Sequence, residues 1–281
     1  MRASRIRLGG EFGDLALGYT DWGDPQAART VVCVHGLTRN ARDFDALAAA
    51  LAARGVRVVA VDVAGRGTSS WLDEPQGYTV PNYARHLRAF LAALGLAQVD
   101  WVGTSMGGLI GMTVAAEEDS PIRTLVLNDI GPSVPKEALG YIKTYLGLDL
   151  RFETLAELEA HLRAVHAGFG PLSDAQWHHL AVHSARETPE GWRLHYDPQI
   201  RVPFAEAAGE DIDLWAEWDR IRCPTHVLRG AESPLLTPAT AEAMAGRGPR
   251  ATVETVPGVG HAPALMAEDQ IATVARWLGL K

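Results

Sequence analysis

Short, mostly apolar runs alternate with longer segments of helical spacing along the first half of the chain. The run Val31 to Val34 is apolar at every position and does not alternate between apolar and polar residues. Strands with both faces covered have this composition, and strands alternating with helices form parallel sheets. The pattern therefore predicts an α/β fold, with a mostly parallel central sheet flanked by helices. The predicted strands cover 12–22, 30–35, 57–62, 99–102 and 124–129, and the predicted helices 44–53, 80–94 and 109–116.

The alternation stops after Gly131-Pro132. From 132 to about 218 the chain has helical spacing, several aromatic residues and most of the histidines, without a clear buried strand. Strand character returns at 225–230 and 251–256, and a final helix is expected over about 264–278. We therefore predict one α/β core made of 1–131 and 219–281, interrupted by a mostly helical insertion at 132–218.

The segment Gly103-Thr104-Ser105-Met106-Gly107 lies between a predicted strand and a predicted helix. A G-x-S-x-G in that context is typical of a nucleophile elbow, a turn so tight that the two flanking glycines have no room for a Cβ. The serine hydroxyl then stands above the strand end, near the N–H groups of the helix. The context favours Ser105 as a nucleophile over a glycine-rich turn without chemistry.

Composition and charge exclude several classes of protein. The 281 residues are 47% hydrophobic and 21% charged, which is enough for a buried core. With 26 Lys and Arg against 34 Asp and Glu and no basic run, nucleic acid and membranes are not expected partners. No apolar stretch is long enough to cross a bilayer, and Cys33 and Cys223 are expected to be reduced core residues. We expect a cytoplasmic protein; a homodimer is possible.

Four landmarks follow one another along the chain: His35-Gly36 after a strand, Asp62-x-x-Gly65-x-Gly67-x-Ser69, the turn around Ser105, and Pro257-Gly258-Val259-Gly260-His261. In this order they resemble the α/β-hydrolase superfamily, and the resemblance covers nearly the whole chain. It implies the α/β-hydrolase fold, with the insertion at 132–218 as a helical cap. It does not give the reaction, because this fold hosts many chemistries.

The resemblance also implies roles for individual residues. Ser105 would be the nucleophile, and His261, late in the chain, would be the base that takes its proton. The oxyanion hole would consist of two backbone N–H groups, from Leu37 after His35-Gly36 and from Met106 after the nucleophile. Backbone donors tolerate any side chain, so the identities of Leu37 and Met106 carry little information.

The third member of the triad departs from the usual pattern. The superfamily normally places its acid just past the strand that follows the cap, but that site reads Gly230-Ala231-Glu232-Ser233-Pro234. Glu232 is one substitute, and Asp129, at the end of the strand after the elbow strand, is the other. Asp129 could also be a turn residue. We expect Asp129 to be the acid, because sequential parallel strands are usually neighbours and their carboxyl ends open on one face.

Arg39 and the cap histidines are further candidates for binding. Arg39 follows the predicted oxyanion loop and could hold a substrate carboxylate, or it could be a solvated loop residue. The histidines include helical spacings that could ligate a metal, but the sequence shows no carboxylate or cysteine set beside them. We therefore expect neither a metal nor a cofactor. The cap histidines in question are His161, His166, His178, His179 and His183.

These residues predict hydrolysis of a carboxylic ester of a small to medium molecule through an acyl-enzyme intermediate. A serine at the elbow disfavours the related dehalogenases and epoxide hydrolases, which use aspartate there. Two alternatives stay open. One is hydrolysis of a carbon–carbon bond in a vinylogous diketo acid, for which Arg39 would suit the anionic substrate. The other is a small-molecule receptor that keeps the triad without turnover.

Overall fold

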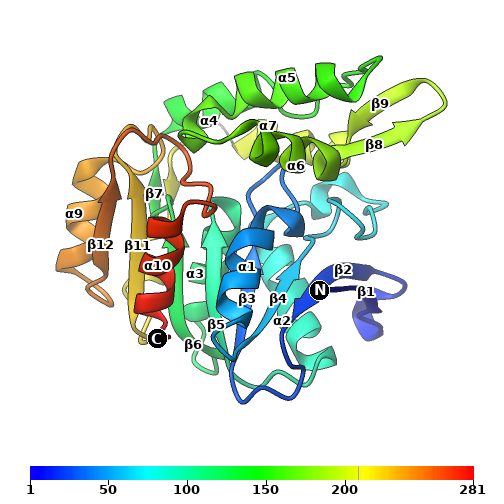
Figure 1. Ribbon diagram of the computed structural model, residues 1–281. Coiled ribbons are helices and arrows are strands. Elements are labelled where there is room, and N and C mark those ends of the chain that lie inside the picture. The colour runs from blue at the N-terminus through cyan, green and yellow to red at the C-terminus, as the bar shows by residue number, and fades with distance from the viewer. Residues whose placement is uncertain (208) are drawn as a thin grey trace.

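The computed structural model describes residues 1–207 and 209–281. Its centre is an eight-stranded sheet in the order β1-β2-β4-β3-β5-β6-β11-β12 (Figure 1). The six strands from β4 to β12 run parallel, and β1 and β2 are antiparallel to their neighbours, so the predicted mostly parallel sheet is confirmed. The strands are β1 (Arg2–Arg7), β2 (Ala16–Trp22), β3 (Thr30–Val34), β4 (Arg57–Val61), β5 (Val99–Thr104), β6 (Ile122–Asn128), β11 (Thr225–Gly230) and β12 (Thr252–Val256).

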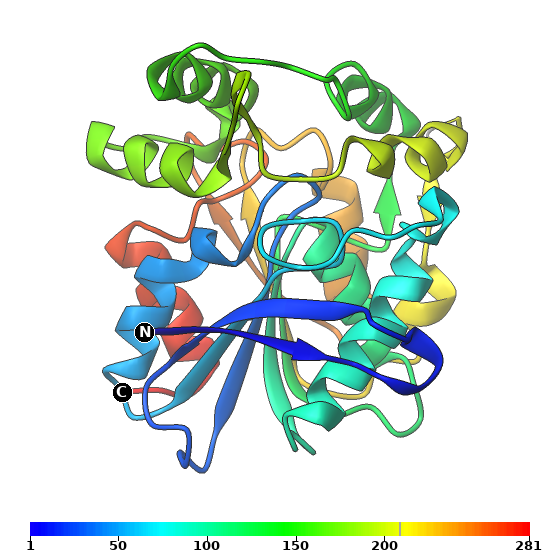
Figure 2. The ribbon, with the colours of Figure 1, turned by 90° about the vertical axis from the view of Figure 1, so that its right-hand side faces the viewer.

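Helices cover both faces of this sheet (Figure 2). On one face α1 (Asp45–Ala52) and α10 (Glu268–Trp277) pack over Val31 and Cys33 of β3. On the other face α2 (Val80–Ala93), α3 (Met106–Ala115) and α9 (Pro238–Gly246) contribute to the apolar cluster that also contains Val32 and Val34. Successive side chains of a strand point to opposite faces, and here both faces are covered. This double burial explains why the strand is apolar throughout.

Four elements of the core differ from those expected. The strand expected over 12–22 begins only at Ala16, because Gly10–Phe12 form a short 3-10 helix. The edge strand β1 was not predicted, because it is mostly exposed and lacks an apolar run. Helix α9 was not predicted either. The final helix begins at Glu268 instead of about 264, because the loop that carries His261 extends to that point.

Most of the insertion lies over the carboxyl end of the sheet (Figures 1 and 2). We call the segment 132–218 the cap; its limits as a separate domain stay a prediction. Besides the expected helices, the segment holds a hairpin and a short strand pair, whose partly exposed residues give no buried-strand pattern in the sequence. Its elements are β7 (Ser133–Val134), α4 (Lys136–Lys143), α5 (Leu155–Val165), α6 (Asp174–Ser184), β8 (Ala185–Thr188), β9 (Gly191–Leu194), α7 (Arg201–Ala207), β10 (Ile212–Asp213) and α8 (Trp215–Trp218).

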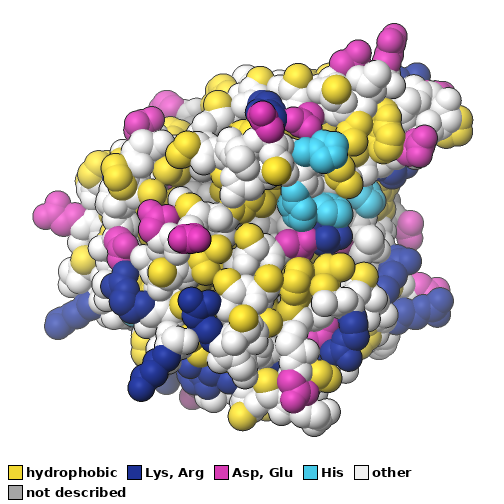
Figure 3. All heavy atoms as spheres, in the orientation of Figure 1, with side chains coloured by type: hydrophobic (Ala, Val, Ile, Leu, Met, Phe, Trp, Pro, Cys, Tyr) yellow, Lys and Arg dark blue, Asp and Glu magenta, His cyan; other side chains and the backbone are white. Residues whose placement is uncertain are grey.

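The surface gives two further observations. Within the described residues, no helix combines the length and the apolar character needed to span a bilayer. Figure 3 shows charged side chains scattered among apolar ones, with histidines gathered on the face where α6 lies. Cys33 and Cys223 are both free thiols, and Cys33 is fully buried as expected. The cytoplasmic location and the oligomeric state stay predictions.

Candidate active site

Ser105 lies on a strained turn between β5 and α3. Its backbone has φ 51° and ψ −118°, a conformation that residues other than glycine rarely adopt. A Cβ on Gly107 would lie 2.0 Å from the carbonyl oxygen of Val34, and one on Gly103 would lie 2.3 Å from that of Gly107. Both distances are too short for a side chain. The two glycines are therefore required for the turn, as the sequence pattern predicts.

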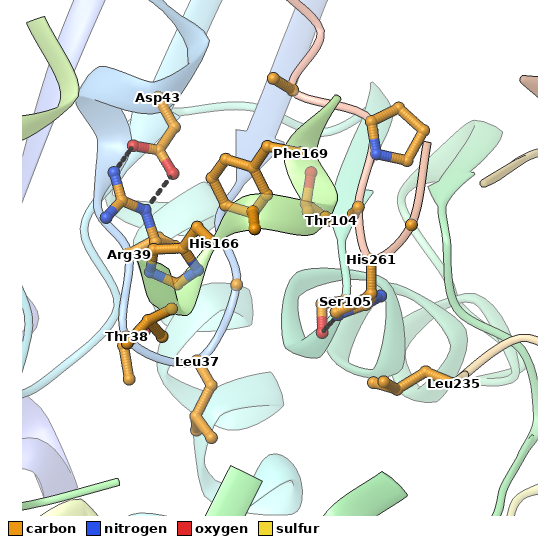
Figure 4. A pocket seen from close by; sticks show the side chains of 18 of the residues that line it. Leu37, Thr38, Arg39, Asp43, Thr104, Ser105, His166, Phe169, Leu235 and His261 are labelled. Carbon is orange, nitrogen blue, oxygen red and sulfur yellow. Dashed lines mark hydrogen bonds and ion pairs between the residues drawn. The ribbon is translucent and has the colours of Figure 1, made fainter. Parts of the chain in front are cut away.

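A continuous series of hydrogen bonds joins three predicted residues. The Nε2 atom of His261 lies 2.8 Å from the Oγ atom of Ser105 (Figure 4), and Nδ1 lies 2.7 Å from the Oδ2 atom of Asp129. An ionised carboxylate can only accept, so Nδ1 carries the proton of that bond. The Nε2 atom is then the acceptor for the hydroxyl proton of Ser105. The arrangement can therefore take a proton from the serine.

Asp129 is fully buried directly after β6 and has a positive φ of 55°. Its second carboxylate oxygen, Oδ1, accepts the backbone N–H of Gly230 at 2.7 Å, at the end of β11. A Cβ on Gly230 would lie 2.0 Å from the carbonyl oxygen of Gly260. A glycine at this position therefore lets the loop of His261 come close to the acid. The requirement depends on a contact between distant segments, so the sequence alone did not reveal it.

Glu232, the alternative acid, lies in a different place. Its side chain is exposed at the rim of the cavity described below. Its backbone N–H donates to the carbonyl oxygen of Val259 at 2.9 Å, which ties two loops together. Because the Nδ1 atom of His261 is bonded to Asp129, the structure brings Asp129 and not Glu232 to the imidazole.

The loop of Leu37 is held by two buried side chains. His35 is fully buried; its Nε2 atom accepts the N–H of Val63 at 2.9 Å, so its Nδ1–H donates to the carbonyl oxygen of Gly36 at 2.7 Å. Burial lowers the pKa of His35 to about 3, so its ring is neutral at neutral pH. Arg66, which the sequence analysis did not single out, is also fully buried and donates to the carbonyl oxygen of Leu37 at 2.8 Å.

The two backbone N–H groups that were predicted as oxyanion donors are not used in the backbone hydrogen bonds described for this part of the chain. In the described part of the chain, neither the N–H of Leu37 nor that of Met106 donates a backbone hydrogen bond. Met106 is the first residue of α3, where helix N–H groups have no partner within the helix. The positive end of the helix dipole lies at the same point and favours an anion. Two backbone donors can thus serve a negative oxygen next to Ser105.

A cavity of about 310 Å³ opens above Ser105, between the carboxyl end of the sheet and the cap. The core contributes Leu37, Ser105 and Leu235 to its wall, and the cap contributes Tyr145 and Phe169. Most of the lining surface is apolar. Pockets for small molecules occupy roughly 300–1,000 Å³, so this one lies at the small end of that range.

Arg39 is buried at one side of this cavity and is already paired (Figure 4). Its Nε and Nη2 atoms donate to the carboxylate of Asp43 at 2.8 and 2.7 Å, and its guanidinium lies 5.9 Å from the ring centroid of Phe169. His166 stacks on Phe169 with ring centroids 4.7 Å apart. Burial, with Arg39 nearby, lowers the pKa of His166 well below its ordinary value, so His166 is neutral. The pairing with Asp43 was not expected.

The cap also touches the loop that carries His261. The N–H of Gly260 donates to the carbonyl oxygen of Gly168 in the cap at 2.8 Å. A Cβ on Gly168 would lie 3.0 Å from the backbone nitrogen of His261. The cap therefore contacts the imidazole-bearing loop as well as enclosing the cavity. Nothing in the sequence pattern indicated this contact.

Comparison with known proteins agrees with this architecture. The model of the Alpha/beta hydrolase family matches residues 31–276. The chain belongs to this family. It is 46% identical to a 3-hydroxybutyrate-oligomer hydrolase of Cupriavidus necator, over 91% of this chain and 90% of the relative.

Two crystal structures have the same fold along almost their whole length. A protein from Rickettsia typhi, 30% identical, superposes with a TM-score of 0.93 and covers 99% of both chains. An alpha/beta hydrolase from Novosphingobium aromaticivorans, 35% identical, has a TM-score of 0.87 and covers 99% of this chain and 98% of its own. The family and fold predicted from the landmarks are thereby confirmed.

Proposed function

We propose that this hydrolase cleaves a carboxylic ester through an acyl-enzyme intermediate on Ser105. The observation that carries the proposal is the hydrogen-bond series from Asp129 through His261 to Ser105 beneath the cavity. A serine hydroxyl becomes an effective nucleophile when an adjacent base removes its proton, and a buried carboxylate holds that base in the required tautomer. Here His261 is hydrogen-bonded to both Ser105 and Asp129.

The geometry supports the following sequence of steps. The Oγ atom of Ser105 attacks the ester carbonyl while Nε2 of His261 takes its proton. The negative oxygen of the tetrahedral intermediate is stabilised by the N–H groups of Leu37 and Met106. The C–O bond to the alcohol then breaks, and the imidazolium gives its proton to the departing oxygen. Water attacks the acyl-enzyme with His261 again as base, releasing the acid and restoring Ser105.

We further propose that the substrate is a short ester oligomer of a 3-hydroxy acid with a free carboxylate at one end. The relative from Cupriavidus necator, named for hydrolysis of 3-hydroxybutyrate oligomers, supports this class. The small apolar cavity suits a short chain with few charges. Arg39, one of whose two interpretations from sequence was a carboxylate-binding residue, lines the cavity wall and is paired with Asp43.

Arg39 is proposed as the group that holds the free carboxylate. Two of its nitrogens are bonded to Asp43, which fixes the guanidinium in one orientation against Phe169. Its remaining terminal nitrogen, Nη1, donates no hydrogen bond to any residue within 1–207 or 209–281. A substrate carboxylate can accept from this atom. The neutral ring of His166 lies beside the same site and adds no second charge.

The test compares 3-hydroxybutyrate dimer and trimer with their methyl esters and with p-nitrophenyl butyrate. Arg39→Gln should lower kcat/KM for the free acids by roughly 10- to 100-fold, since a hydrogen bond to a charged group contributes roughly 1.5–3 kcal/mol. It should leave p-nitrophenyl butyrate little changed. The matched control is Arg42→Gln, which removes an arginine of the same loop that also pairs with an aspartate but does not line the cavity.

Three results would count against parts of this proposal. If Arg39→Gln lowered kcat/KM equally for the free acids and for their methyl esters, Arg39 would have no role in binding the carboxylate. Turnover of a vinylogous diketo acid without turnover of any ester would favour the carbon–carbon hydrolase. Tight binding of esters without release of product would favour a receptor.

A further inference from the structure

A cluster of metal-binding side chains lies outside the cavity, where the cap meets the core. It consists of Asp45, His179 and His183, whose donor atoms all lie within 4.8 Å of one another. The two histidines are four residues apart on α6 and so share one face of that helix, while Asp45 is the first residue of α1. Figure 3 shows histidine side chains gathered on this face, beside acidic and basic groups.

The sequence analysis expected no metal because it found no carboxylate beside the cap histidines. That premise is wrong for His178, which lies beside Glu159, and for His179 and His183, which lie beside Asp45. The Nε2 atom of His179 lies 3.5 Å from the Oδ2 atom of Asp45, although the two residues are far apart in the chain. A carboxylate from the core therefore completes a pair of imidazoles from the cap.

We propose that these three residues bind a divalent transition metal ion of the zinc or nickel class. Zinc binds imidazole and carboxylate at roughly 2.0–2.1 Å, so neighbouring ligand atoms of a tetrahedral site are about 3.3 Å apart. The distance of 3.5 Å between His179 and Asp45 is close to that value. The other donor atoms lie within 4.8 Å of one another, so they must approach by at most about 1.5 Å to reach the same spacing. Water would supply the fourth ligand.

The position that the metal would take is now approached by the guanidinium of Arg42. Its Nε atom lies 2.8 Å from Oδ2 of Asp45, and its Nη1 donates to Nδ1 of His183 at 3.3 Å. An arginine can only donate, so the lone pair of that imidazole nitrogen is directed into the cluster. A cation therefore already faces two of the three proposed ligands.

Metal binding requires two local changes. Arg42 must turn outward, which its side chain, 28% exposed, can do towards solvent. The Nε2 atom of His179, which donates to the carbonyl oxygen of Arg42 at 3.0 Å, must give up that proton so that its lone pair can bind the metal. The wild-type affinity is therefore lower than that of a site without a competing arginine.

A bound metal would link α6 of the cap to α1 of the core. Close to this point the side-chain amide of Asn40, in the core segment before α1, already donates to the carbonyl oxygen of His183 at 2.9 Å. An ion that binds the folded chain and not the unfolded chain raises the stability of the fold. We therefore expect Zn²⁺ to raise the Tm of the protein.

The experiment titrates the untagged full chain with Zn²⁺ by calorimetry and with Co²⁺ by visible absorption. One ion per chain is expected, with intense Co²⁺ bands typical of a tetrahedral site. His183→Gln and Asp45→Asn should each weaken Zn²⁺ binding at least tenfold. Arg42→Gln should strengthen it about tenfold, because it removes the competing cation. The control is His178→Gln, which removes an exposed histidine of the same helix that faces Glu159 instead.

Arg42→Gln and His183→Gln are expected to change the Zn²⁺ affinity in opposite directions, so the test stays decisive even if one variant folds poorly. Circular dichroism would show whether each variant is folded. Equal Zn²⁺ affinity in the wild type and in Arg42→Gln, His183→Gln and Asp45→Asn would overturn the inference. So would a loss of binding in His178→Gln alone. None of these readouts depends on catalysis, so the inference stands or fails separately from the proposed function.

Discussion

Replacing Asp129 by asparagine removes one hydrogen-bond acceptor from a site that uses two. The carboxylate accepts the N–H of Gly230 and the Nδ1–H of His261, each at 2.7 Å, and it is fully buried. Asparagine keeps the shape but has a single acceptor oxygen and an NH₂ group. The backbone donor of Gly230 cannot move, so the oxygen stays there and the NH₂ faces His261. The imidazole then places its lone pair on Nδ1 and its proton on Nε2, towards Ser105.

This change of tautomer should cost roughly 10²–10⁴-fold in kcat, with KM little changed. The Nε2 atom of His261 can no longer accept the proton of Ser105, and the buried negative charge that stabilises the imidazolium is gone. Since each tenfold loss corresponds to about 1.4 kcal/mol, the barrier should rise by about 3 to 6 kcal/mol. The size of the effect follows from the full burial of Asp129, because water cannot replace the missing acceptor.

The assay measures kcat and KM on p-nitrophenyl butyrate for Asp129→Asn and for Glu232→Gln as the matched control. Glu232 is exposed at the rim of the cavity, so its variant should keep near wild-type kcat. Circular dichroism and thermal unfolding check that both variants are folded. Near-normal activity in Asp129→Asn together with a large loss in Glu232→Gln would refute the reasoning and assign the acid to Glu232.

Two further predictions follow from the backbone strain at Ser105 and from the burial of the neutral ring of His35. Ser105→Ala and Ser105→Gly should both lose at least 10³-fold in kcat. In denaturant unfolding, Ser105→Gly should be about 1 kcal/mol more stable than Ser105→Ala, because the φ of 51° at this position suits glycine. Equal stability of the two variants would contradict the proposed backbone strain. The pKa of His35 is lowered to about 3, so below about pH 6.5 the unfolded chain binds a proton that the folded chain does not. As the pH decreases from about 6.5 towards 3, His35 alone should therefore lower the free energy of unfolding by about 1.4 kcal/mol per pH unit. His35→Gln should make the pH dependence of that free energy shallower by this amount, and an unchanged slope would argue against a buried neutral ring.

The features that sequence predicts well here are those with a local physical cause. The apolar strands were recognisable because both faces of the sheet are covered, as the side chains of Val31 and Val32 show by packing on opposite faces. The elbow was recognisable because its backbone excludes a Cβ at Gly103 and Gly107. The contact of Asp129 with His261 followed from the pairing of β5 with β6, which puts the ends of both strands at one edge.

The features that sequence did not predict depend on contacts between distant segments. The edge strand β1 is exposed and rich in arginine, so no apolar pattern marks it. Arg66 acts on the loop of Leu37, and Gly168 meets Gly260, through contacts that no spacing along the chain reveals. The position of Asp45 beside His179 is of the same kind. Contacts of this sort are set by how the cap lies on the core, which the local pattern of residues does not encode.

The central claim is that Ser105 is the group that forms the covalent intermediate. It is tested most directly by treating the protein with a fluorophosphonate and locating the adduct by peptide mass spectrometry. We expect one adduct per chain, on the peptide that contains Ser105, with loss of ester hydrolysis in proportion to labelling and no adduct in Ser105→Ala. An adduct on a different residue, or full labelling of Ser105 with ester hydrolysis intact, would contradict the account.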